Sequence, residues 1–243
     1  MKSRIDAIED IIKPYGKYKW HDWVFNKICE LVSENDQSVI LDAGCGTDSW
    51  IIKRVRNQNK SIYVIGIDID PNGKNNQDID EFHQASVNKL PCGENSIDVV
   101  VCSWVLEHIE DPEEALNEIN RVLKPGGCFI FWTPNKYNPA MLISAHTNQK
   151  LHRLIMRMLL RHSEWDNCQT FYRMNSIRDL EAQATKSGFE IKELVLTNGA
   201  YQYFRNSSCL YIFACLVSKA FNLWPLNKLK QRILGVFKKD LMK

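Results

Sequence analysis

The feature that most constrains the fold is a short apolar run that ends in an acidic residue and two glycines, within Val39–Asp48. The apolar run predicts a buried strand, and Gly44 and Gly46 allow the backbone to turn sharply beside a ligand, because glycine has no Cβ. A helix is expected to begin near Asp48–Ser49, so that its first N–H groups face the same ligand. We interpret this segment as the strand, turn and helix that open a nucleotide-type binding unit.

The turn differs from the dinucleotide-binding fingerprint at two positions. That pattern has a third glycine where this chain has Ser49, and it does not require the acid Asp42 two residues before the first glycine. An acid at Asp42 suits a ligand with a positively charged amino group better than it suits a pyrophosphate.

Strand and helix patterns alternate along the rest of the chain. Strands are expected over 38–43, 61–67, 82–86, 97–102, 128–133, 189–196 and 232–238. Helices are expected over 21–33, 48–57, 112–123, 141–162, 176–187 and 209–223. This alternation predicts an α/β fold, a seven-stranded, mostly parallel sheet with helices on both faces. Ligands of such sheets bind beyond the carboxyl ends of the strands, where Asp42–Gly46, Asp68 and Ser103 would lie.

Asp68 closes the second expected strand. A carboxylate there can accept hydrogen bonds from both ribose hydroxyls of an adenosine. Asp68 follows Gly46 by 22 residues (68 − 46), close to the roughly 20 that separate the two features in a nucleotide-binding unit. Together they predict an adenosine-containing ligand, either NAD or S-adenosylmethionine.

Four later motifs distinguish these two cofactors: Leu90–Val100, Val105–Pro112, Arg121–Gly127 and Thr133–Asn135. In order and spacing, the region from about residue 37 to 136 resembles the Rossmann-like (class I) S-adenosylmethionine-dependent methyltransferases, of the ubiquinone/menaquinone C-methyltransferase or "type 11" kind. The resemblance implies an enzyme that transfers a methyl group from S-adenosyl-L-methionine to a small-molecule, lipid or glycan acceptor by direct displacement. Two alternatives remain open, an NAD(P)-dependent oxidoreductase and a catalytically silent binding protein with the cofactor fold.

The resemblance also implies which residues hold the cofactor. Asp42, Gly44 and Gly46 would cradle its methionine part, and Asp68 would hold its ribose. The full implied set is Asp42, Gly44, Gly46, Asp68, Ile69, Ser86, Val87, Ser103 and Trp104. At Ala85–Ser86 the family usually has Gly-Asp, whose acid accepts from the adenine amino group, so Ser86 would be a weaker, neutral acceptor.

His108 is the histidine beside the expected site, and with Glu107 it is a candidate general base. The alternative is that this pair only caps the loop before Pro112. Because a sulfonium is a good leaving group and alignment supplies much of the rate, methyl transfer to an acceptor that is already nucleophilic needs little help from a base.

The acceptor is expected to meet residues beyond Pro134. Tyr172 and Arg173 are candidates for contact with an anionic or polar acceptor. The alternative is that Arg173 pairs structurally and that Asn175 or Ser176 caps the helix that follows.

A length of 243 residues suits one domain. We divide it into N-terminal helices (1–36), a cofactor-binding core (37–136), a helical lid inserted over the acceptor (137–175), and C-terminal helices with the last strands (176–243).

Composition argues against nucleic-acid binding and against a metal site. The net charge of +2 gives no argument for nucleic acid, and the eight cysteines show neither a C-x-x-C pattern nor metal-ligand spacing. We therefore expect no metal and expect reduced core thiols such as Cys102 and Cys128, hence a cytoplasmic protein. Met1–Ile12 predicts a short amphipathic helix rather than a signal peptide.

The C-terminal part has an uneven charge. Between Thr197 and Lys239 there is no Asp or Glu, but there are seven basic residues. One interpretation is peripheral membrane contact through 141–162 and 205–239, with apolar side chains at the interface and lysines on the rim. The alternative is a lid and a core helix that other parts of the protein cover. The oligomeric state cannot be inferred from the sequence.

Overall fold

The computed structural model describes residues 20–32, 37–58, 61–139, 141, 169–198 and 208–241. The predicted helices 1–12 and 141–162 and most of the predicted lid lie outside the described residues.

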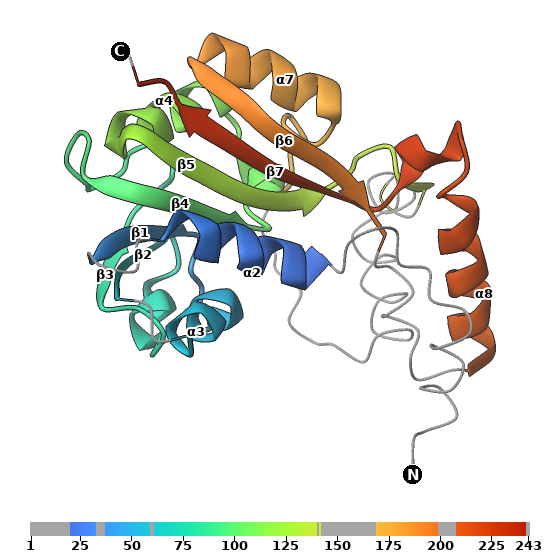
Figure 1. The fold of residues 1–243 in the computed structure, drawn as a ribbon, viewed down its shortest axis with the longest axis horizontal. Coiled ribbons are helices and arrows are strands. Elements are labelled where there is room, and N and C mark those ends of the chain that lie inside the picture. Colours follow the sequence, from blue (N-terminus) through green and yellow to red (C-terminus); the bar gives the residue numbers. More distant parts are fainter. Residues whose placement is uncertain are drawn as a thin grey trace. The chain divides into compact units, whose positions relative to one another are not determined.

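In the described part of the chain, seven strands form one sheet in the order β3-β2-β1-β4-β5-β7-β6 (Figure 1). They are β1 (Ser38–Ala43), β2 (Ile62–Asp68), β3 (Glu81–Gln84), β4 (Ile97–Ser103), β5 (Leu123–Pro134), β6 (Phe189–Thr197) and β7 (Arg232–Lys239). Neighbouring strands from β3 to β5 are parallel. The predicted α/β fold with a seven-stranded, mostly parallel sheet is confirmed.

The described residues also form helices. They are α2 (Trp20–Leu31), α3 (Trp50–Arg56), α4 (Pro112–Val122), α7 (Ile177–Lys186) and α8 (Ser208–Ala220), with short 3-10 turns η1 (Pro71–Asn75), η2 (Leu106–His108) and η4 (Leu226–Leu229). The connection from β1 to β2 and the connection from β4 to β5 run in opposite directions across the sheet. Because such crossovers are right-handed, α3 and α4 lie on opposite faces. Accordingly α2 packs against α3, and α4 packs against α7.

The helix ends follow from the local sequence. Asp111 precedes α4 and accepts a hydrogen bond from the Glu114 N–H at 3.1 Å. Ser176 does the same for α7, accepting from the Asp179 N–H at 3.1 Å. Both satisfy an N–H group that the first helical turn leaves without a partner in the helix. The prediction that Asn175 or Ser176 caps this helix is confirmed for Ser176.

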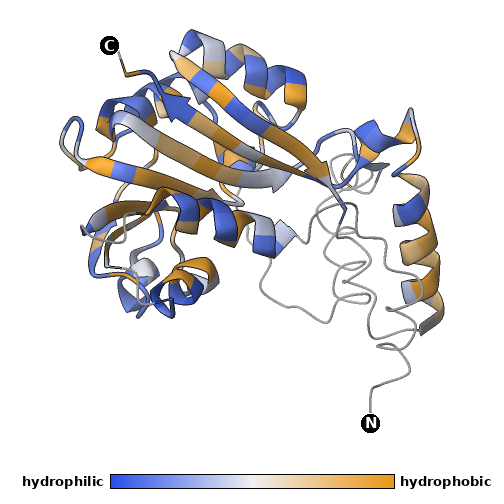
Figure 2. Ribbon diagram, viewed as in Figure 1, coloured by the Kyte–Doolittle hydropathy of each residue, from blue (hydrophilic) through white to orange (hydrophobic). Residues whose placement is uncertain are grey.

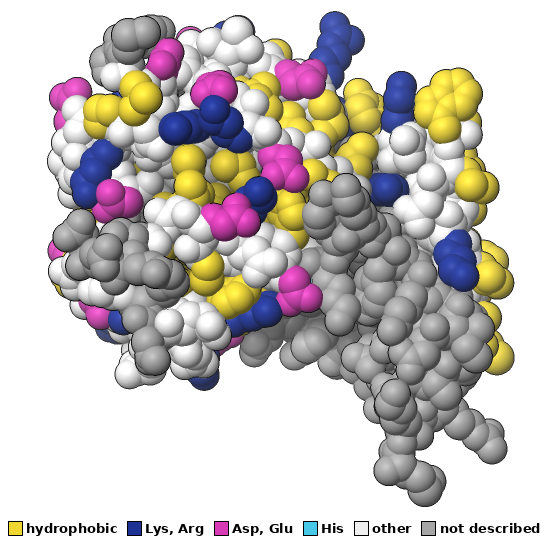
Figure 3. Space-filling model, viewed as in Figure 1, with side chains coloured by type: hydrophobic (Ala, Val, Ile, Leu, Met, Phe, Trp, Pro, Cys, Tyr) yellow, Lys and Arg dark blue, Asp and Glu magenta, His cyan; other side chains and the backbone are white. Residues whose placement is uncertain are grey.

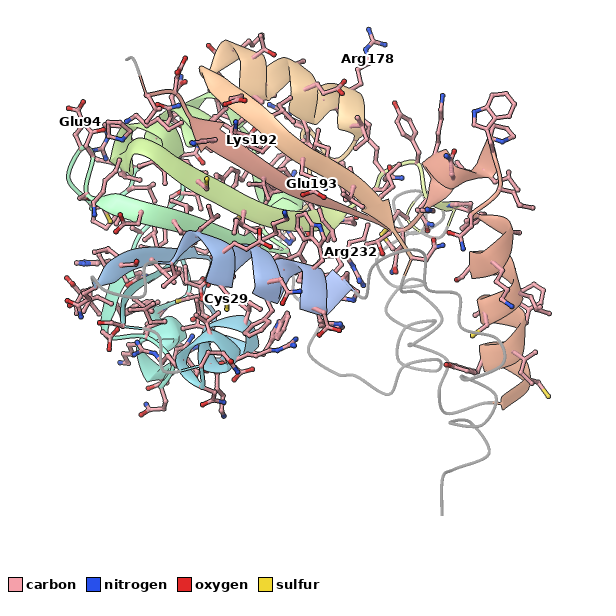
Figure 4. The ribbon with its side chains drawn as sticks, in the orientation of Figure 1. Cys29, Glu94, Arg178, Lys192, Glu193 and Arg232 are labelled. Atoms are coloured by element: carbon pink, nitrogen blue, oxygen red, sulfur yellow. The ribbon has the colours of Figure 1, made fainter. Side chains whose placement is uncertain are left out.

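The core lies along β4, β5 and β7, whose side chains are buried over long runs (apolar residues are orange in Figure 2). Such continuous burial is typical of strands covered on both faces. The rings of Phe131 and Phe237 pack edge to face, with their centroids 4.9 Å apart. Cys102 and Cys128 are buried in these strands, as expected of core thiols. On the edge strand β6, Glu193 (Figure 4) accepts a hydrogen bond from Trp23 Nε1 of α2 at 3.2 Å.

One predicted boundary was wrong. Strand β5 begins at Leu123, so Lys124–Gly127 continue the strand instead of only ending the preceding helix. Leu123 pairs with Ile97 of β4, and the register shifts between Ile97 and Val99. Lys124 Nζ also lies 2.8 Å from the Asp98 carboxylate. Pairing with β4 therefore extends the strand through a Pro-Gly-Gly segment that suggests a turn when seen alone.

The chain divides into two compact units. The larger unit comprises Trp20–Thr133, Thr170–Val195 and Leu234–Lys243, and the smaller unit comprises Met1–Lys19, Pro134–Gln169 and Leu196–Ile233. All candidate cofactor and acceptor residues belong to the larger unit, whereas α8 belongs to the smaller one. The single-domain assignment and its internal boundaries stay predictions.

Candidate cofactor site

The glycine turn after β1 is tied to the end of β2. The Gly44 N–H and the Cys45 N–H donate to the Ile67 carbonyl at 2.8 and 3.0 Å. The Gly46 N–H donates to Asp68 Oδ2 at 2.9 Å. The turn and the acid that were predicted from separate motifs are therefore in direct contact.

The two glycines serve different purposes. Both have positive φ, +82° at Gly44 and +51° at Gly46. A Cβ on Gly44 would lie 2.2 Å from Val105 Cγ2, so the loop after β4 packs closely on this turn. A Cβ on Gly46 would meet no atom within 4 Å. Gly44 therefore lets the loops after β1 and β4 pack closely together, at the point where the strand order reverses. Gly46 instead has an open side on which a ligand can approach.

Asp68 retains hydrogen-bonding capacity. Its Oδ2 accepts from Gly46, and its Oδ1 accepts from the Asp70 N–H at 2.9 Å. Because each carboxylate oxygen has about two lone-pair sites, both oxygens can accept one more donor. The next side chain, Ile69, is 65% exposed. An acid and an exposed apolar side chain at the end of β2 suit a ribose and an adenine ring.

Asp42 is buried behind the turn. The Ser49 hydroxyl donates to its carboxylate, which gives a structural reason for serine at the position of the third glycine in the dinucleotide pattern. The pKa of Asp42 is raised to about 6, mainly by burial; the Ser49 bond lowers it, and the charges of Asp68 and Asp78 add to the rise. A carboxylate in this position gains from a nearby positive charge.

Two residues that sequence analysis missed hold the turn in place. Asn76 Nδ2 donates to the Cys45 carbonyl and to Ser49 Oγ, both at 3.0 Å. Asp78 Oδ2 accepts from the Ser49 N–H at 3.1 Å. The expectation that the N–H groups at the start of this helix face the ligand is therefore wrong for Ser49, whose N–H is bonded within the protein. The run of Asn and Asp residues before β3 was the available signal, because these residues build such turns.

The Ser86–Val87 segment lies beside the end of β2, because the Ala85 N–H donates to the Asp68 carbonyl at 3.0 Å. Ser86 is exposed, and its Oγ accepts from the Asn88 N–H at 3.2 Å. Val87 is buried. The fold thus places both near Asp68, and their contact with adenine stays a prediction.

Ser103 is the last residue of β4, and Trp104 follows it with a φ of +55°. Both side chains are half-buried. A bulky residue with positive φ is uncommon and is found preferentially at functional sites. Their contact with the reactive end of the cofactor stays a prediction.

Glu107 belongs to a buried polar chain. Its carboxylate accepts from Thr133 Oγ1 at 3.2 Å, and that hydroxyl accepts from Asn175 Nδ2 at 2.6 Å. Burial raises the pKa of Glu107, while its hydrogen bonds and the charge of His108 lower it. Glu107 therefore links the β4 loop, the end of β5 and the segment before α7, and half-buried His108 lies beside it as an untested candidate base.

The Tyr172–Arg173 segment is anchored to the same loop. The Phe171 N–H and the Tyr172 N–H donate to the Glu107 carbonyl at 2.8 and 3.2 Å. Exposed Arg173 donates from Nη1 to the Glu110 carbonyl at 2.5 Å. This bond supports the structural alternative for Arg173, and acceptor contact by either side chain stays a prediction.

Parts of the chain are similar in sequence to known proteins. Residues 41–131 match the family model described as methyltransferase domain. Demethylmenaquinone methyltransferase of Staphylococcus epidermidis is 35% identical over 138 residues, which cover 54% of this chain and 55% of that protein. Thiol S-methyltransferase TMT1B of Rattus norvegicus is 29% identical over 129 residues, or 45% of this chain and 48% of that protein. The chain thus spans about half the length of these curated relatives.

Solved structures share the fold over most of the chain. A geranyl diphosphate methyltransferase in complex with GPP and sinefungin aligns with a TM-score of 0.59 and 14% identity, covering 90% of this chain and 76% of that one. The [4+2]-cyclase SpnF aligns with a TM-score of 0.56 and 16% identity, covering 90% and 81%. At such identities the likeness concerns the fold alone. The motifs, the fold and the family match agree: residues 41–131 match the methyltransferase-domain family, and the chain resembles the class I, Rossmann-like menaquinone methyltransferases.

Proposed function

We propose that this chain binds S-adenosyl-L-methionine and transfers its methyl group to a small-molecule acceptor by direct displacement. The observation that carries the proposal is the contact between the glycine turn and Asp68, with an open side at Gly46. The methyltransferase-domain match over 41–131 supports it.

The residues present fit this cofactor. In the proposal, Asp42, Gly44 and Gly46 hold its charged amino-acid end, and Asp68 accepts from the ribose hydroxyls. The adenine ring would cover exposed Ile69, beside Ser86 and Val87. When bound, the cofactor supplies a methyl group on a sulfonium, which leaves as a neutral thioether.

In this reaction the chain's own residues would mainly align the acceptor with the methyl group. Ser103 and Trp104 follow the central strand β4 and would line the reacting end, so that the acceptor meets the methyl group in line. His108 would take a proton from an acceptor that has one to lose. Tyr172 and Arg173 would border the acceptor.

An NAD(P)-dependent oxidoreductase is the weaker alternative. The position of its third glycine is occupied by buried Ser49, which is bonded to Asp42. A catalytically silent protein with the same cofactor fold would also use this turn, and the comparisons give no support to either alternative.

The acceptor class is proposed from the relatives, whose names mention demethylmenaquinone, thiols and geranyl diphosphate. Lipid and glycan acceptors belong to the same proposal. The test is transfer of a labelled methyl group from S-adenosylmethionine to a panel containing a demethylmenaquinone, an alkyl thiol, geranyl diphosphate and a glycan. We expect acceptor-dependent labelling that Asp68→Ala reduces. Cofactor binding without labelling of any acceptor in a broader screen would favour the silent alternative.

A further inference from the structure

Helix α8 has two apolar faces, and the structure covers one of them. Tyr211, Cys215 and Ser218 are buried and follow one another at helical spacing. On the opposite side, Phe213 is 66% and Leu216 is 54% exposed. An apolar helix face is usually buried, so this exposed face calls for an occupant.

The exposed face continues beyond the end of the helix. Leu223, Trp224 and Leu226 are 65%, 81% and 39% exposed. We call Phe213, Leu216, Leu223, Trp224 and Leu226 the α8 surface. Figure 3 shows apolar side chains gathered along the outer edge of this region, with basic side chains between them. A single exposed apolar side chain needs no explanation, whereas a group of this kind marks an interaction surface.

The positive charge around the α8 surface indicates which kind of partner fits it. Lys219 and Lys228 are exposed beside it, and the sequence from Thr197 to Lys239 contains no acid. A second copy of this chain would bring lysines against lysines across a two-fold interface, without acids from this segment to pair with them. Anionic headgroups over an apolar layer complement both the basic rim and the apolar centre.

The length of α8 decides how it would meet a bilayer. Its 13 residues extend about 20 Å, short of the roughly 30 Å hydrocarbon core. Among the described residues, no helix is long and apolar enough to cross a membrane. An element of this kind lies in the plane of the interface. Tryptophan, here Trp224, is the residue most typical of that level of a membrane.

We propose that the α8 surface docks on an anionic phospholipid bilayer, with α8 in the plane of the membrane at headgroup level. The proposal rests on residues of the smaller unit and is independent of the proposed methyl transfer.

The test is co-sedimentation of the full chain with phosphatidylcholine vesicles, with and without phosphatidylglycerol, at low and high salt. We expect binding to the anionic vesicles that weakens as salt rises. Tryptophan emission should shift to the blue on binding. Trp224→Phe should lose most of that shift and still sediment.

Matched variants locate the contact. Leu223→Ser should weaken binding at least tenfold, because it replaces an apolar side chain that the membrane would bury with a polar one. Leu241→Ser is the control, because Leu241 is 67% exposed in the larger unit. Lys219→Glu and Lys228→Glu together should weaken binding by at least tenfold at low salt, and Lys186→Glu on α7 should not.

Three results would overturn the proposal. The first is no sedimentation with anionic vesicles at low salt. The second is binding that Leu223→Ser and the lysine pair leave unchanged. The third is a stable dimer by light scattering that Leu223→Ser converts to monomer, which would assign the α8 surface to a second copy. The thermal unfolding of each variant shows whether a loss of binding is only a loss of fold.

Discussion

At the scale of single residues, Asp68 takes part in both the turn and the proposed ligand contact. Its carboxylate accepts from the Gly46 and Asp70 N–H groups. We expect Asp68→Ala to weaken binding of S-adenosylhomocysteine more than tenfold, since two hydroxyls would lose a charged acceptor, a loss on the order of 2–3 kcal/mol. Isothermal titration measures this. Asp70→Ala is the control, because the Asp70 carboxylate accepts from the Asn72 N–H at 2.9 Å. An unchanged affinity of Asp68→Ala would show that the ribose binds elsewhere.

Alanine at the two glycines of the turn should have different effects: Gly44→Ala should mainly lower stability, whereas Gly46→Ala should mainly weaken cofactor binding. Gly44→Ala should lower the free energy of unfolding by more than about 2 kcal/mol, because its Cβ would meet Val105 at a φ of +82°. Gly46→Ala should cost about 1 kcal/mol, for the left-handed backbone alone. Its methyl group would enter the open side of the turn and weaken cofactor binding. Urea unfolding and titration separate the two effects, and normal binding by a folded Gly46→Ala would place the ligand elsewhere.

The raised pKa of Asp42 predicts opposite pH trends for stability and binding. The folded chain holds this proton between the ordinary pKa of 3.8 and about 6, where the unfolded chain has lost it. Asp42 therefore lowers the free energy of unfolding as pH rises through that window. A ligand ammonium needs the ionised form, so affinity for S-adenosylhomocysteine should fall as pH drops below about 6.

Unfolding curves between about pH 4 and pH 7 and titrations over the same range, each compared with Asp42→Asn, check both trends. The variant should bind weakly with a flatter pH profile. Equal pH dependence in both proteins would show that Asp42 does not cause these trends.

At the scale of elements, the side-chain hydrogen bonds that link Glu107, Thr133 and Asn175 join three separate segments. Thr133→Val should lower the free energy of unfolding by roughly 1–3 kcal/mol, because it removes the hydroxyl that lies between a buried carboxylate and a buried amide. Thr185→Val on α7 is the control, since its exposed hydroxyl donates to a helix carbonyl at 2.9 Å. Equal effects in chemical unfolding would show that the buried chain contributes nothing special.

The elements themselves were largely predictable, because apolar runs and caps are local signals. Strand β1 has its predicted bounds, and Ser176 caps α7 as one interpretation held. The start of β5 was not predictable, because pairing with Ile97 of β4 overrides a local turn signal at Lys124–Gly127.

The candidate site also has features that could be predicted from the sequence and contacts that could not. The glycine turn and Asp68 are visible as motifs, but their mutual hydrogen bond is not. Asn76 and Asp78 reach Ser49 from 27 and 29 residues further along the chain. Nothing in the local sequence pairs them, because residues so far apart along the chain meet only once it is folded.

At the scale of the whole molecule, the fold places the turn at the switch point of the sheet but does not determine the reaction. A methyltransferase and a cyclase share this fold at similar TM-scores, 0.59 and 0.56. The central claim is therefore the identity of the ligand at the Gly46–Asp68 turn, and the acceptor and the membrane surface are separate questions.

The most direct test of that claim is isothermal titration of the full chain with S-adenosylhomocysteine and, separately, with NAD. The acid at Asp42, the turn that is open at Gly46 and the carboxylate of Asp68 predict binding of S-adenosylhomocysteine and no measurable heat with NAD. Tight NAD binding with none for S-adenosylhomocysteine would contradict the account and restore the oxidoreductase alternative.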